Sequence, residues 1–184
     1  MAANGIPPPH ANGVNGIYGN GLTKRPVRIA GASGGFSDRQ RAIRSLAALD
    51  VDAIVGDWLS ECTMTLHGGQ KVENERLRAV GKLYEEPMGL FDPTFIENLA
   101  PALPDISRKG IKVAVNAGAC DTELLANTVR DEVQRQGLDL KVAYIEGDEV
   151  TEIVNQMIKQ GEKFTSLMTG EDLQDWGYTP IYAQ

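Results

Sequence analysis

The chain has 184 residues, of which 42% are hydrophobic and 23% charged, and its formal net charge is −7. These proportions are typical of one globular domain with a hydrophobic core. A negative net charge without a Lys/Arg cluster argues against nucleic acid or a membrane surface as a partner, and no apolar run is long enough to cross a bilayer. Two cysteines are too few for a disulfide framework, and no secretory leader is evident, so we expect a cytoplasmic protein.

The first part of the chain predicts a tail followed by two strands and a helix. Residues 1–25 are rich in Gly, Asn and Pro and poor in large apolar side chains, so we expect a disordered tail. Apolar runs predict strands at Val27–Gly31 and Val51–Val55, and the pattern between them predicts a helix over 38–49. Continuous apolar runs of this kind are typical of buried parallel strands.

A long and irregular connection, residues 57–104, follows the second strand. We expect a helix from Trp58 to about His67, broken by Gly68-Gly69, and a polar helix over 74–84. A short helix is expected at 95–102. This connection is a candidate lid or docking surface.

The last part of the chain repeats the strand–helix alternation twice. Strands are predicted at Ile111–Val115 and Leu140–Ile145, with a helix after each, the second being the most amphipathic pattern in the chain. Repeated alternation predicts an α/β fold with right-handed crossovers. We expect residues 26–184 to form a Rossmann-like open, mainly parallel sheet of about four to five strands with helices on both faces.

Ligands of open parallel sheets bind outside the carboxyl ends of the strands. A single strand followed by Gly and Asp is an ordinary turn, but four such ends together indicate a shared site. A glycine turn before a helix also exposes backbone N–H groups to an anion. The residues expected to bind substrate or an anion are Ser33, Gly34, Gly35, Gly118 and Gly147.

The same strand ends supply the candidate catalytic residues. Asp57, Glu61 and Asp148 would provide an acid, a base or a metal ligand, and Asn116 would orient a substrate oxygen. Asp57 and Glu61 share a helix face if a helix begins at Asp57, while Asp148 is a helix cap or a magnesium ligand. The two histidines and two cysteines lack the spacing of a zinc site, so no zinc centre is predicted and none of them is assigned as a metal ligand.

Cys120 and the first glycine turn leave two alternatives open. Cys120 precedes a helix, where thiolates are stabilised, so it is a candidate nucleophile as well as a packing residue. No convincing base accompanies it, because His67 is the only histidine outside the tail. Gly31-Ala32-Ser33-Gly34-Gly35 does not spell G-x-G-x-x-G, yet Asp57 stands near the place of a ribose-binding acid. A dinucleotide-binding domain therefore remains an alternative.

Read together, the strand ends resemble the N-terminal domain of the acyclic terpene utilisation protein A family. The resemblance extends from about Arg25 to Tyr182. The segments that carry it are Gly31–Arg39, Gly56-Asp57-Trp58-Leu59-Ser60-Glu61, Asn116-Ala117-Gly118, Glu146-Gly147-Asp148, Thr169-Gly170-Glu171 and Trp176-Gly177. One departure is that many relatives continue Asn-Ala-Gly with a further glycine and Asn-Pro, where this chain has Ala119-Cys120-Asp121-Thr122.

The resemblance implies bacterial breakdown of branched acyclic terpenes through coenzyme A thioesters. It favours an enzyme acting on a small carboxylate or an acyl-CoA thioester, with magnesium as a conceivable cofactor, and it implies that the chain is the front part of a longer domain. The alternative is a non-catalytic binding or assembly module that docks through residues 57–104. The partner would then be a second copy, in a homo-oligomer, or a C-terminal partner domain.

Overall fold

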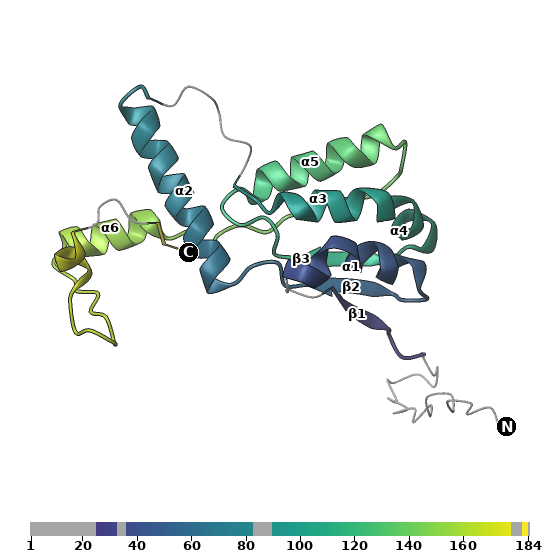
Figure 1. Cartoon of the computed structure of the whole chain (residues 1–184), viewed down its shortest axis with the longest axis horizontal. Coiled ribbons are helices and arrows are strands. Elements are labelled where there is room, and N and C mark those ends of the chain that lie inside the picture. Colours follow the sequence, from purple (N-terminus) through teal and green to yellow (C-terminus); the bar gives the residue numbers. More distant parts are fainter. Residues whose placement is uncertain (1–24, 33–35, 83–89, 178–181, 184) are drawn as a thin grey trace, which may run out of the picture.

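The structure is a computed structural model that describes residues 25–32, 36–82, 90–177 and 182–183 (Figure 1). Strands β1 (Ile29–Ala32), β2 (Ala53–Gly56) and β3 (Lys112–Val115) form a parallel sheet in the order β1-β2-β3. The helices are α1 (Phe36–Ala48), α2 (Glu61–Ala79), α3 (Pro93–Leu99), α4 (Leu103–Lys109), α5 (Thr122–Arg135) and α6 (Thr151–Lys159), with 3₁₀ turns η1 (Ala100–Ala102) and η2 (Leu173–Trp176). The predicted α/β class is confirmed.

The core lies on one face of this sheet. Ala32 and Ile54 are buried there against side chains of α1, α3, α4 and α5, which gather on one side of the sheet in Figure 1. On the opposite face Ile29 and Val55 are 64% and 42% exposed. The prediction of four to five strands with helices on both faces is therefore wrong for the described residues, which form three strands covered on one face.

The strand predicted at Leu140–Ile145 is extended chain that joins no ladder. Leu138, Leu140 and Val142 alternate in packing against the core, as the residues of a strand do. However, the only described hydrogen bond to the backbone of 139–149 is from the Arg130 guanidinium to the Val142 carbonyl, at 3.1 Å. The alternating pattern predicted which side chains of this segment are partly buried, but the segment does not pair with β3.

Helix α2 runs unbroken through Gly68-Gly69, contrary to the predicted break (Figure 1). Its start is fixed by a capping box, in which the Ser60 hydroxyl accepts from the Thr63 N–H and the Thr63 hydroxyl accepts from the Ser60 N–H. Gly68 is buried because the Tyr182 ring packs on it; an added Cβ would lie 2.8 Å from Tyr182 Cδ1. Gly68 is thus a docking position rather than a helix stop.

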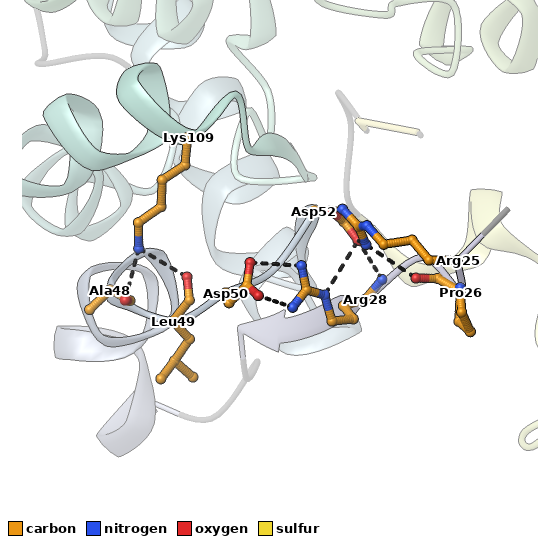
Figure 2. Close-up of polar contacts among 8 residues, drawn as sticks. All are labelled: Arg25, Pro26, Arg28, Ala48, Leu49, Asp50, Asp52 and Lys109. Carbon is orange, nitrogen blue, oxygen red and sulfur yellow. Dashed lines mark hydrogen bonds and ion pairs between the residues drawn. The ribbon is translucent and has the colours of Figure 1, made fainter. Parts of the chain in front are cut away.

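The amino-terminal ends of the strands are held by charged groups (Figure 2). The Arg25 guanidinium donates to both oxygens of Asp52, at 2.5 and 2.7 Å, and the Arg28 N–H donates to Asp52 Oδ2 at 2.8 Å. These hydrogen bonds, chiefly that of Arg25, hold the pKa of Asp52 well below its usual range. Arg28 also pairs with Asp50. The contacts tie the lead-in to β1 to that of β2.

A lysine closes the end of α1. Lys109 Nζ donates to the carbonyls of Ala47, Ala48 and Leu49 at 2.6, 2.8 and 3.0 Å. Figure 2 shows the contacts with Ala48 and Leu49. A cation at a helix C-terminus satisfies the last carbonyls and interacts favourably with the helix dipole.

Of the tail predicted over 1–25, only Arg25 lies within the described residues. Among the helices described, none is both long and apolar enough to cross a membrane.

Candidate functional site

An open cleft of about 1150 Å³ lies where the strands end, between that edge of the sheet, α2 and α6. Helices α2 and α6 lie beyond this end of the sheet in Figure 1. All four predicted catalytic residues line the cleft, so the structure brings them together. The lining residues are Asp57, Leu59, Ser60, Glu61, Met64, Thr65, Gly68, Gly69, Val72, Asn116, Asp148, Val154, Phe164, Leu173, Trp176, Tyr182 and Ala183.

In the turn after β2, Trp58 is buried and the residue before it, Asp57, is exposed. Trp58 is fully buried and meets the Phe95 ring edge-on, with 5.4 Å between the ring centroids. The indole folds back over Gly56, where an added Cβ would lie 2.3 Å from Trp58 Cζ3. Gly56 is therefore required by close packing, and the exposed Asp57 between these residues stands at the cleft.

Asn116, directly after β3, holds this turn. Its Nδ2 donates to Asp57 Oδ1 at 2.7 Å, and its Oδ1 accepts from the Trp58 and Leu59 N–H groups at 2.6 and 3.3 Å. The side chain predicted to orient substrate is thus largely occupied by the protein itself. It fixes the position of the Asp57 carboxylate relative to the sheet.

Two further carboxylates approach from helix starts. Glu61 lies in the first turn of α2, and Asp148 follows Gly147, which has a φ of +121°, shortly before α6. In the described part of the chain, no three His, Cys, Asp or Glu side chains converge closely enough to hold a metal ion. These carboxylates border the cleft as separate anionic groups.

The apolar wall of the cleft was not anticipated as part of the site. Met64 and Val72 come from α2 and Val154 from α6, while the segment after α6 contributes further large side chains. Those are Phe164, Leu173, Trp176 and Tyr182. The Trp176-Gly177 pair was a sequence signal for this wall, but nothing in the local sequence indicated which surface it would meet.

Tyr182 and Ala183 join α2 to α6. The Lys71 ammonium lies 4.8 Å from the centroid of the Tyr182 ring, which rests on Gly68. Ala183 accepts from the Val150 N–H at 2.8 Å and donates to the Thr151 hydroxyl at 2.8 Å. This short segment forms part of the cleft wall.

Cys120 lies behind this wall, outside the cleft lining. Burial raises the pKa of its thiol, outweighing a hydrogen bond with Tyr182 and the nearby Lys71 charge, which lower it. Burial together with the same hydrogen bond raises the pKa of Tyr182. Both groups are therefore held in their protonated forms, which favours the packing role of Cys120 over the nucleophilic one.

The predicted anion-binding residues divide into three cases. Ser33, Gly34 and Gly35 lie outside the described residues. Gly118 is buried, and an added Cβ would lie 2.9 Å from Thr122 Cα, so this glycine serves the packing of the α5 start. Gly147 has open space around it and supplies the positive φ that precedes Asp148.

Comparison with known proteins supports the family resemblance that the motifs at the strand ends indicated. The family model described as "Acyclic terpene utilisation family protein AtuA" matches residues 27–184. Searches of curated proteins and of solved structures found no match. The matched region contains β1 to β3, all six helices and every residue that lines the cleft. The chain therefore belongs to the acyclic terpene utilisation (AtuA) family.

Proposed function

We propose that the cleft is the active site of a metabolic enzyme that acts on a small carboxylate or an acyl-CoA thioester in terpene utilisation. Family membership suggests the metabolic role. The observation that carries the proposal is the hydrogen bond from Asn116 to Asp57 at the carboxyl ends of adjacent strands, within a cleft of substrate size. Fixed carboxylates at such a position are suited to proton transfer.

Asp57 is the residue proposed to act as the base. Its Oδ1 accepts from Asn116, and Oδ2 has no hydrogen-bond partner among the described residues. A substrate proton next to an acyl carbonyl would move to Oδ2, leaving negative charge on the carbonyl oxygen. The second Nδ2 hydrogen of Asn116 is a donor for that oxygen. Glu61 or Asp148, in its carboxylic-acid form, would return a proton to the product, and Asp57 would then pass the proton it took to water.

A binding or assembly module remains a second candidate because apolar side chains of the 57–104 connection are exposed. Leu66 on α2 is 66% exposed and Val80 at its end is 55% exposed. Apolar groups exposed along one helix can mark a docking surface. Concentration-dependent association of the chain that is abolished by Leu66→Asp, with the melting temperature unchanged, would favour this function.

The test of the enzymatic proposal is ligand-dependent melting of the full chain. The ligands are a branched acyl-CoA thioester, the matching free acid, free coenzyme A and a dinucleotide. A ligand present at about 100 times its dissociation constant stabilises the fold by about 2.7 kcal/mol, which is readily measured. We expect the thioester or the acid to raise the melting temperature, and Trp176→Ala, which removes part of the cleft wall, to reduce that rise.

Glu75→Gln is the matched control, because Glu75 is an exposed residue of α2 outside the cleft lining. It should leave the ligand response unchanged. A response to the dinucleotide alone, or a rise that Trp176→Ala leaves intact, would contradict the proposed function.

A further inference from the structure

A second cavity, of about 720 Å³, lies between α1 and the segment that runs from α3 to α4. In Figure 1 these helices lie to the right of α2 and α6, and the cavity shares no lining residue with the cleft. The lining residues are Arg41, Arg44, Ser45, Ala48, Glu97, Asn98, Pro101 and Asp105. Most of these side chains are polar or charged, so this cavity differs in chemistry from the apolar wall of the cleft.

One wall of the cavity carries two arginines. Arg41 and Arg44 are three positions apart on α1, so their side chains are neighbours on one helix face. Both arginines are exposed, and neither has a hydrogen bond or an ion pair to any residue that the structure describes. Two guanidinium groups side by side can bind a carboxylate through paired N–H donors.

The facing wall carries acceptors. Glu97 on α3 is exposed and likewise has no ion pair with a described residue, whereas Asp105 on α4 already accepts from Arg108 at 2.5 Å. Arg41, Arg44 and Glu97 therefore line one cavity without pairing with one another. The two walls thus present charges of opposite sign, and a ligand that carries both signs can bridge them.

Asn98, next to Glu97, adds a buried acceptor to this wall. Asn98 is 3% exposed, and its Nδ2 donates to the Thr94 carbonyl at 2.7 Å, which identifies Oδ1 as the other amide atom. Oδ1 is buried and accepts no hydrogen bond from the described residues. A buried acceptor without a donor is destabilising, so an N–H group that reached this oxygen would be bound favourably.

We propose that this cavity binds a small polar zwitterion of the α-amino acid class. The ligand carboxylate would accept from Arg41 and Arg44, and the ligand ammonium would donate to Glu97 and to Asn98 Oδ1. A ligand with only one charge would satisfy one wall and meet the like charge of the other. This site goes beyond the proposed function and is independent of it, because it shares no residue with the cleft.

The test compares glutamine with two analogues that each lack one charged group. These are 4-carbamoylbutanoate, which lacks the ammonium, and 4-aminobutanamide, which lacks the carboxylate. Dissociation constants are measured by calorimetry on the full chain. We expect glutamine to bind at least about tenfold more tightly than either analogue, because each loses hydrogen bonds to charged groups. An analogue that binds as tightly as glutamine, or no binding of glutamine, would overturn the proposal.

Variants assign each charged group of the ligand to one wall. Arg41→Met and Arg44→Met remove a positive charge and should reduce the advantage of glutamine over 4-aminobutanamide. Glu97→Gln should reduce the advantage of glutamine over 4-carbamoylbutanoate. These side chains are exposed and unpaired among the described residues, so the variants should melt like the wild type.

The matched controls are Arg76→Met and Glu75→Gln, which make the same changes at exposed positions of α2 outside the cavity. Both should retain the full preference for glutamine. An unchanged preference in the folded Arg41, Arg44 and Glu97 variants, or an equal loss in the controls, would overturn the proposal.

Discussion

Asn116 and Asp57, 59 positions apart in the sequence, are joined by a 2.7 Å hydrogen bond at the cleft. They meet because β2 and β3 are neighbours in a parallel sheet, so the residues that follow the two strands emerge at the same edge. The same amide accepts from the Trp58 and Leu59 backbone, which makes it the link between the two strand ends.

Replacing Asn116 by Asp should weaken both the fold and the site. The variant removes the donor to Asp57 and places a second carboxylate against it, so we expect a loss of about 1–3 kcal/mol of unfolding free energy. The rise in melting temperature with the branched acyl-CoA thioester should be lost as well. Denaturant unfolding and ligand-dependent melting measure the two effects.

Asn127→Asp is the control for Asn116→Asp, since it adds the same charge on α5, where Oδ1 of Asn127 only accepts from Arg130. Asn127→Asp should leave the unfolding free energy and the ligand response nearly unchanged. An Asn116→Asp variant that responds to the acyl-CoA thioester like the wild type would show that Asn116 does not position Asp57.

The adjacent glycines of α2 should respond in opposite directions. Gly68→Ala pushes a methyl group against the Tyr182 ring, so we expect a loss of about 1–3 kcal/mol of unfolding free energy and a smaller melting response to the acyl-CoA thioester. Gly69 has no atom within 4 Å of an added Cβ, so Gly69→Ala should gain about 0.5–1 kcal/mol from helix propensity. Equal effects in denaturant unfolding would contradict the docking of Tyr182 on Gly68.

Ala119 should tolerate glycine but not a β-branched residue. It is buried and has a φ of +43°, in the left-handed region that alanine adopts at a cost. Ala119→Val should lose about 1–3 kcal/mol of stability, while in Ala119→Gly the relief of strain and the lost methyl contact largely offset each other.

Ala114→Val, on the exposed face of β3, is the matched control for the added methyl groups and should be neutral or stabilising. Thermal unfolding of Ala119→Val, Ala119→Gly and Ala114→Val measures the order of their stabilities. An Ala119→Val variant as stable as Ala114→Val would rule out the strained turn.

Sequence reasoning anticipated polar residues that line the cleft but not its apolar wall. Asp57 and Asn116 were predictable because each follows a strand, and the topology of a parallel sheet brings such ends together. Asp148 was predicted on the same ground, but the run before it joins no ladder, so its place in the cleft does not follow from the sheet.

Tyr182 packs on Gly68 of α2 across more than a hundred residues, and Trp176 lines the same cleft. Tertiary packing decides these placements, and no local pattern encodes them. The apparent break at Gly68-Gly69 failed for the same reason, since Tyr182 occupies the space left by Gly68.

The two cysteines should differ in reactivity. Cys62 is exposed, whereas burial raises the pKa of Cys120, so less of the Cys120 thiol is the reactive thiolate at neutral pH. We expect iodoacetamide to label Cys62 first and Cys120 only as the pH rises above the usual thiol range near ~8.5. Peptide mapping after timed labelling measures this, and rapid labelling of Cys120 at neutral pH would revive its role as a nucleophile.

Mass-spectrometric detection of product from a branched acyl-CoA thioester, with the wild-type chain and Asp57→Asn side by side, tests the central claim most directly. The side chains of Asp and Asn have nearly the same shape, and Asn can still accept from Asn116, so the variant should melt close to the wild type. We predict product with the wild type and none with Asp57→Asn. Equal product from both proteins would contradict the assignment of the cleft as an active site with Asp57 as its base.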